Sequence, residues 1–153
     1  MNNNDHFLRI SPTENKRSHH LGQFILQLRR LERSPRSFGN AGTLTPSEIH
    51  TIDAIGNEGS VLMSELALRL GITKGAVTQI VDRLESKALA IRSPHPTDSR
   101  SVFVSLTEKG QEAFRVHEEI HVSFYQELRS TFSEEEIDIF ERCLMKLTEA
   151  MKR

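Results

Sequence analysis

Apolar side chains recur at every third or fourth position over long stretches of this chain, which is the spacing of one face of an α-helix. The pattern predicts amphipathic helices over residues 18–33, 46–56, 107–130 and 134–151. Residues 1–17 are polar and show no such period, so we expect a flexible N-terminal arm there. Residues 34–44 combine Gly, Pro, Ser and Asn, which is the composition of a loop.

The helix predicted after Thr45 has a complete start signal. The side chain of Thr45 suits the cap position, Pro46 suits the first helical position, and Glu48 completes a capping box with the threonine. Local hydrogen bonding alone therefore predicts where this helix begins.

A different pattern occupies the middle of the chain. Two short amphipathic stretches follow the capping residues Ser64 and Thr73, and Gly71 lies between them, which is the arrangement of a helix-turn-helix. Further along, residues 89–92 and 101–106 are rich in β-branched and aromatic types and predict two strands. The prolines between these strands exclude regular structure there, and the pair forms a hairpin, or wing. The predicted fold class is therefore mainly α, a winged helix-turn-helix with additional N- and C-terminal helices.

Composition narrows the class of protein. The chain has 153 residues with 20 Lys and Arg against 21 Asp and Glu, so neither a polybasic tail nor an acidic disordered protein fits. Its one cysteine, Cys143, excludes an intramolecular disulfide and indicates a reducing compartment. No apolar run is long enough for a membrane span, and the N-terminus lacks a secretory signal. We expect a cytoplasmic protein.

The helix predicted from Thr73 to Lys87 carries polar side chains opposite Val77 and Leu84. Gln and Arg pair with base edges in the DNA major groove, Thr contacts the thymine methyl group, and Lys meets phosphate. On the wing, an arginine suits a narrow minor groove, and the neighbouring aspartate is expected to hold that arginine or the hairpin in shape. Double-stranded DNA is the predicted partner, and the predicted DNA-binding residues are Ser64, Thr73, Lys74, Gly75, Thr78, Gln79, Arg83, His95, Asp98 and Arg100.

Three segments together resemble one family. They read LTPSEIHTIDAI from residue 44, MSELALRLGITKGAVTQIVDRLESKALAIR from residue 63, and HPTDSRSVFVSLTEKG from residue 95. The last is similar to a wing signature, an Asp-x-Arg followed by a strand and Leu-Thr-x-x-Gly. On these segments the chain resembles transcriptional regulators of the MarR family over about residues 18–153. The resemblance implies a dimer with one winged helix per subunit that reads a pseudo-palindromic operator, usually as a repressor.

The terminal helices have surplus apolar surface that agrees with a homodimer. In the last helix the apolar residues are spaced 3, 4, 3, 4, which is the seam that one helix presents to another. We therefore expect residues 18–45 and 107–153 to form the dimerisation part and residues 46–106 the DNA-binding part. The predicted interface residues are Leu21, Phe24, Leu28, Phe140, Leu144, Leu147 and Met151.

The histidines suggest an effector. His117 and His121 are four residues apart on one helix, the spacing at which two imidazoles can share a metal. The chain is similar here to a branch of the MarR family that represses zinc uptake, and the resemblance implies one zinc site per subunit made of Glu32, His50, His117 and His121. The cysteine and further glutamates of a second site in that branch have no counterpart, since residues 37–39 read Ser-Phe-Gly.

Three alternatives stay open. The first is a MarR-like regulator that senses a small aromatic or phenolic ligand, with the histidines as packing residues and no metal site. The second is a small metal hydrolase using His117 and His121, but the chain lacks a nucleophile motif, a Gly-rich phosphate loop and an open metal position, so we do not expect an enzyme. The third is a winged helix that binds only protein, against which the polar face with Lys74, Gln79 and Arg83 argues.

Overall fold

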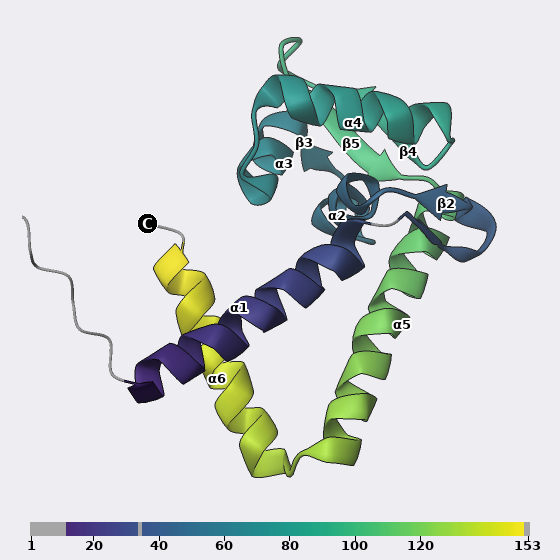
Figure 1. The fold of residues 1–153 in the computed structure, drawn as a ribbon. Coiled ribbons are helices and arrows are strands. Elements are labelled where there is room, and N and C mark those ends of the chain that lie inside the picture. Colours follow the sequence, from purple (N-terminus) through teal and green to yellow (C-terminus); the bar gives the residue numbers. More distant parts are fainter. Residues whose placement is uncertain (1–11, 34, 152–153) are drawn as a thin grey trace, which may run out of the picture.

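Six α-helices and two small antiparallel sheets make up the described part of the chain in a computed structural model (Figure 1). The structure describes residues 12–33 and 35–151, with side chains over 19–30 and 35–151. The helices are α1 (Pro12–Arg33), α2 (Pro46–Ile55), α3 (Met63–Leu70), α4 (Lys74–Ser86), α5 (Glu108–Thr131) and α6 (Glu134–Met151). The strands are β1 (Arg36–Ser37), β2 (Thr43–Leu44), β3 (Val61–Leu62), β4 (Ala90–Pro94) and β5 (Val102–Leu106), with a 3₁₀ turn η1 (Gly39–Ala41).

The first helix starts earlier than the apolar pattern predicts. α1 begins at Pro12, so residues 12–17 of the expected arm are helical, and residues 1–11 lie outside the described residues. Proline is favourable in a first helical turn, where its missing N–H leaves no hydrogen bond unmade. A helix end does not need an apolar face, and periodicity alone therefore placed the start too late.

The segment between α1 and α2 is more regular than its loop composition predicts. β1 and β2 pair antiparallel around η1, and the side chains of Phe38 and Leu44 are buried in the core. The carboxylate of Glu112 on α5 accepts hydrogen bonds from the backbone N–H of Asn40 (3.1 Å) and from its side-chain amide (3.4 Å). Apolar burial and these two bonds fasten the segment to α5.

The central unit confirms the predicted winged helix-turn-helix (Figure 1). Helices α2, α3 and α4 pack against a three-stranded sheet in the order β3-β5-β4. Ile52, Leu66, Val77 and Leu84 are among the fully buried side chains at the centre of this core. Gly71 ends α3 with φ of 64°, a left-handed conformation that favours glycine.

Two predicted details of this unit are wrong. Ser64 does not cap α3, because the helix begins at Met63 and its cap residue is Leu62, which is also the last residue of β3. Pro94 was expected in an irregular tip, but it ends β4 opposite Val102. β4 is an edge strand of its sheet, where a missing N–H need not break the ladder.

A close backbone contact joins the wing to α5. Thr107, the cap residue of α5, donates its N–H to the carbonyl of Leu89 (3.1 Å) and its hydroxyl to the carbonyl of Ala88 (2.7 Å). A Cβ atom at Gly110 would lie 2.0 Å from the carbonyl oxygen of Leu89. The glycine of the Leu-Thr-x-x-Gly segment is therefore a steric requirement of this joint.

α5 extends away from the winged unit, and α6 turns back from its far end, so that the two helices form a V (Figure 1). Of the predicted interface residues, Phe140 is half-buried, and the following are exposed: Leu21, Phe24, Leu28, Leu144, Leu147 and Met151. A single copy of the chain thus leaves apolar faces of α1 and α6 in water. None of the helices in the described residues has the length and the continuous apolar character needed to cross a membrane.

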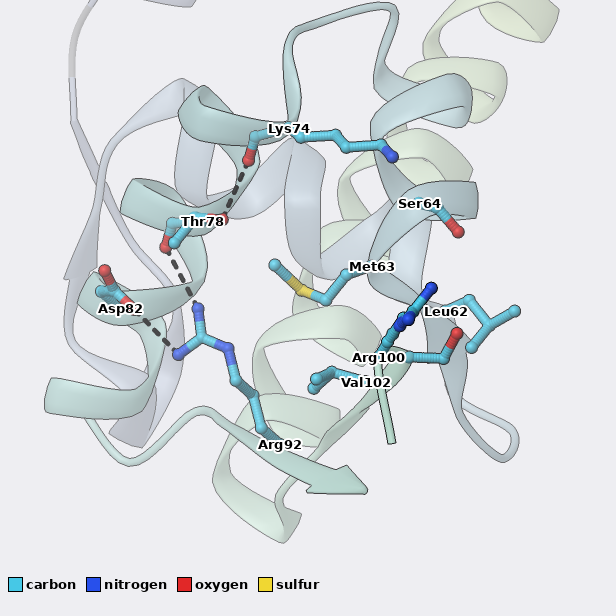
Figure 2. A pocket seen from close by; sticks show the side chains of 10 residues that line it. Leu62, Met63, Ser64, Lys74, Thr78, Asp82, Arg92, Arg100 and Val102 are labelled. Atoms are coloured by element: carbon cyan, nitrogen blue, oxygen red, sulfur yellow. Dashed lines mark hydrogen bonds and ion pairs between the residues drawn. The ribbon is translucent and has the colours of Figure 1, made fainter. Parts of the chain in front are cut away.

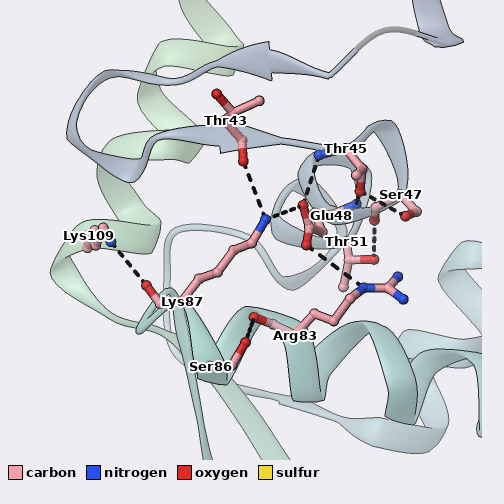
Figure 3. A network of polar contacts seen from close by, with 9 residues as sticks. All are labelled: Thr43, Thr45, Ser47, Glu48, Thr51, Arg83, Ser86, Lys87 and Lys109. Carbon is pink, nitrogen blue, oxygen red and sulfur yellow. Dashed lines mark hydrogen bonds and ion pairs between the residues drawn. The ribbon is translucent and has the colours of Figure 1, made fainter.

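A buried carboxylate links the start of α2 to the far end of α4 (Figure 3). Glu48 is 1% exposed, and its Oε2 accepts hydrogen bonds from the N–H of Thr45 and from Nζ of Lys87, both at 2.8 Å. Burial works to raise the pKa of Glu48, but the bonds from Lys87 and Thr45 more than offset it, so the pKa lies below its ordinary value of 4.5. The capping box is confirmed, and its carboxylate also anchors α4.

We expect Lys87→Met to deprive the buried Glu48 of its ionic partner and to lower the free energy of unfolding by about 1–2 kcal/mol at neutral pH. Because the pKa of Glu48 is lowered by folding, the stability from its ionised form is fully present above pH 4.5 and is lost as the pH falls through the lowered pKa. The deficit of the variant should therefore shrink in acid.

Urea unfolding at neutral pH and in steps below pH 4.5 measures this difference. Lys74→Met removes an exposed lysine from the same helix and is the matched control. A deficit that stays constant across the pH range would show that Lys87 stabilises the chain by some means other than its bond to Glu48.

Candidate nucleic-acid interface

α4 presents a polar face to solvent along its length. Thr73 caps this helix by accepting the N–H of Ala76 at 3.2 Å, and the residues on the opposite face, Val77, Ile80, Val81 and Leu84, are buried in the core. Because the buried face of α4 packs in the core, the opposite face must point to solvent. The exposed residues are Lys74, Gly75, Thr78, Gln79, Asp82, Arg83 and Ser86, five of which are predicted DNA-binding residues.

A groove of about 440 Å³ runs between the start of α3, one side of α4 and the wing (Figure 2). It brings together four of the predicted DNA-binding residues: Ser64, Lys74, Thr78 and Arg100. Three cationic side chains, Lys74, Arg92 and Arg100, line it with one carboxylate, Asp82. The groove therefore has a net positive lining, which suits a phosphodiester backbone.

Arg92 is a residue of this site that sequence reasoning missed. One terminal nitrogen lies 2.8 Å from Oδ1 of Asp82 and also contacts the carboxylate of Glu85, and the other donates to the carbonyl of Thr78 at 3.2 Å. These contacts fasten β4 of the wing to one edge of α4 (Figure 2). The sequence indicates this contact only weakly. Asp82 and Glu85 are one helical turn apart on α4, but an arginine comes near them only in the folded structure.

The wing tip is shaped by Asp98. Its carboxylate accepts hydrogen bonds from the hydroxyl of Ser101 (2.6 Å) and the backbone N–H of Arg100 (3.0 Å), and these bonds lower its pKa. His95 is half-buried at the base of the tip, where its Nδ1 accepts the N–H of Asp98 (3.1 Å) and its ring stacks on Phe103. In the described residues the guanidinium of Arg100 has no such bond and stays available to a ligand.

Other predicted residues lie away from the groove. Gln79 points to solvent from α4, and Arg83 lies at the opposite edge of the helix from the wing, where its Nε is 3.8 Å from Oε1 of Glu48. Thr73 is engaged in capping. The predicted DNA-binding residues thus form two sets on α4, one beside the wing and one beside α2.

Three of the four residues proposed for zinc are neighbours. The ring centroids of His117 and His121 are 4.4 Å apart, and those of His50 and His117 are 6.3 Å apart. Burial and the nearby imidazoles of His121 and His50 lower the pKa of His117, although Asp53 works to raise it. The lowered pKa favours the neutral imidazole, which is the form that binds a metal. The side chain of Glu32 lies outside the described residues.

The histidines are near one another but do not converge as a metal site does. Among the side chains that the structure describes, no three His, Cys, Asp or Glu groups are arranged so that they could hold a metal ion. The ring of Phe38 also lies 6.2 Å from that of His117, so the cluster has an apolar side. The residue types therefore fit zinc, and their present spacing does not.

The chain is similar to known proteins in both sequence and structure. A sequence profile described as MarR family matches residues 43–101. The chain is 33% identical over 110 residues to the HTH-type transcriptional regulator MhqR of Bacillus subtilis, a match that covers 72% of this chain and 71% of that protein. Streptococcus pneumoniae FabT, crystallised in complex with DNA, is 28% identical with a TM-score of 0.72 over 90% of this chain and 94% of that chain.

A zinc-responsive MarR family member, Lactococcus lactis ZitR, is 28% identical with a TM-score of 0.67, over 91% of this chain and 99% of that chain. The profile match spans α2, α3, α4 and most of the wing. Over the same segment the structure shows a helix-turn-helix whose second helix is exposed beside a basic wing. The chain therefore belongs to the MarR family of DNA-binding transcriptional regulators and is not an enzyme.

Proposed function

We propose that this chain acts in the cytoplasm as a homodimeric repressor that binds a pseudo-palindromic operator and whose DNA affinity is set by an effector, zinc or a small molecule. One observation carries the DNA-binding part of the proposal: the positively lined groove between α4 and the wing, with Arg100 unpaired on one wall. A polyanion is the ligand that such a lining suits.

In this proposal α4 lies in the major groove and the wing lies along the adjacent minor groove. Gln79 and Arg83 contact base edges from the exposed face of α4, and Lys74 contacts phosphate at its first turn. Arg100 projects from a hairpin that Asp98 holds in shape, which suits entry into a narrow minor groove. The ion pairs of Arg92 would keep the two DNA-contacting elements at a fixed distance.

The dimer part of the proposal rests on uncovered apolar surface. Leu144 and Leu147 on α6, and Phe24 on α1, are 40–59% exposed in a single copy of the chain. Large apolar side chains in rows along two helices mark a contact surface rather than ordinary solvent-facing residues. A second copy of the chain, related by a two-fold axis, would cover these faces and match the symmetry of a palindromic operator.

Zinc is the first effector candidate, because its proposed ligands come both from the winged unit, through α2, and from the terminal helices α1 and α5. A bound metal would supply a cross-link between them, and His50 of α2 and His117 and His121 of α5 would hold it with Glu32 of α1. Binding in one arrangement of the dimer better than in another would shift the spacing of the two α4 helices. ZitR, described as zinc-responsive, supports the choice of metal by similarity only.

Arg100→Ala should weaken binding to operator and random DNA by similar factors and reduce the slope of log affinity against log salt by about one unit. The measurement is fluorescence anisotropy with a duplex from the chain's own promoter and with a random duplex, at several salt concentrations. Arg129→Ala removes an exposed arginine near the end of α5, far from the wing, and is the control. A wild-type chain that binds neither duplex would disprove the proposal.

Leu144→Asp and Leu147→Asp should convert the dimer to monomer, because each puts a charge into the apolar seam at a cost of several kcal/mol. Light scattering with size-exclusion chromatography reports the mass directly. Lys146→Asp changes a charge on the same helix off the seam and should remain dimeric. The dimer is refuted by a wild-type chain that elutes as a stable monomer.

His121→Ala and His50→Ala should each remove most zinc binding and leave metal-free DNA binding nearly unchanged. His19→Ala on α1 is the control and should retain zinc binding. Isothermal titration of metal-free protein at micromolar concentration gives the affinity, which should fall in acid since each imidazole must lose its proton. A chain that gives no zinc heat, or variants that bind zinc as the wild type does, would leave these histidines as packing residues and favour a small aromatic ligand.

A further inference from the structure

Arg83 has an unusual neighbour for a residue on an exposed helix face. Its side chain is 51% exposed, yet its Nε lies 3.8 Å from Oε1 of Glu48, a carboxylate that is 2% exposed. The two terminal nitrogens of Arg83 point away from Glu48 into solvent (Figure 3). They have no hydrogen-bonding or ionic partner in the described part of the chain. The Nε edge of the guanidinium thus faces Glu48, and the edge formed by the two terminal nitrogens is accessible to a ligand.

Glu48 is itself held in place. Its Oε2 accepts both the N–H of Thr45 and Nζ of Lys87, and Nζ of Lys87 also donates to the carbonyl of Thr43 at 3.3 Å. This arrangement leaves Oε1 directed toward Arg83. The lowered pKa keeps the carboxylate ionised at neutral pH. A fixed negative charge under an exposed arginine favours one set of rotamers for that arginine over others.

The open edge of the guanidinium matches one ligand chemistry. Two parallel N–H donors fit the O6 and N7 acceptors of guanine in the major groove, and this pair distinguishes guanine from the other bases. An arginine that is already oriented loses less conformational freedom when it binds. Arg83 lies on the α2 side of α4, away from the wing groove, so it addresses a different base pair from residues beside the wing.

We propose that Glu48 is the positioning residue of Arg83, and that together they select a guanine in each operator half-site. This inference rests on the proposed function, since it names a base contact of the same α4. The role differs from that of Arg92, which pairs with carboxylates at the other edge of the helix and fastens the wing. In this proposal Glu48 contacts no DNA, and its effect on the choice of base comes through Arg83, in addition to its structural bonds to Thr45 and Lys87.

The test is a selection of duplexes from a random pool by four proteins: wild type, Arg83→Lys, Glu48→Gln, and Glu65→Gln as control. Glu65 is exposed and pairs with Arg69 on α3, so its variant makes the same chemical change away from α4. We expect the wild-type motif to contain a G·C pair at one position of each half-site. Arg83→Lys and Glu48→Gln should both lose at least about fivefold of the preference at that same position, with the other positions unchanged.

Lysine keeps the positive charge of Arg83 but lacks the two parallel N–H donors of the guanidinium. Glutamine keeps the shape of Glu48 but lacks its negative charge. Glu65→Gln should select the wild-type motif. If Glu48→Gln or Arg83→Lys keeps the full preference, or if they lose it at different positions, the positioning role is overturned and the proposed function stands. If the wild type enriches no sequence, both fall.

A second measurement uses the wild-type chain and does not depend on the folding of a variant. The Nε–H resonance of Arg83 should shift with the same midpoint as the carboxyl carbon of Glu48 when the pH is lowered in the dimer without DNA. An Arg83 resonance that stays in place through the titration of Glu48 would mean that the two side chains do not interact, and would overturn the proposal.

Discussion

The geometry of the molecule depends on one close approach of two backbones, at the point where the wing ends and α5 begins. The carbonyl of Leu89 accepts the N–H of Thr107, and Gly110 lets the first turn of α5 come against that same carbonyl. α5 leaves the winged unit in the direction that this contact dictates, and α6 follows α5. The contact therefore determines how the exposed face of α4 is presented relative to the apolar faces of the terminal helices.

Charge pairing fixes α4 within that frame. Glu48 holds its α2 edge through Lys87, and Arg92 holds its wing edge through Asp82 and Glu85. Each contact joins residues on different elements. In each one the charged side chains pair with one another and are not available to a polyanion. Lys74 and Arg100 have no ionic partner among the described residues, and both line the groove beside the wing. Rigid placement of α4 and a positive groove are thus products of the same pairing pattern.

Local signals in the sequence predicted most elements, and tertiary contacts account for the rest. Thr45 and Thr73 cap their helices as expected, because each cap bonds within three residues. The roles of Glu48 toward Lys87, and of Arg92 toward α4, depend on partners that only the fold brings near. The same limit applies to zinc: the register of the histidines was visible in the sequence, but the arrangement of their donor atoms was not.

A lone copy of this chain presents rows of large apolar side chains on α1 and α6 to water. For a homodimer, the step that covers them is bimolecular, so its rate depends on how many copies are present. At low copy number a newly made subunit spends longer with these rows exposed, which makes it a target for chaperones and proteases. For the homodimeric repressor proposed above, the amount of functional regulator would then rise more steeply than the amount of chain synthesised. The threshold for repression would depend on the encounter of subunits as well as on the proposed effector.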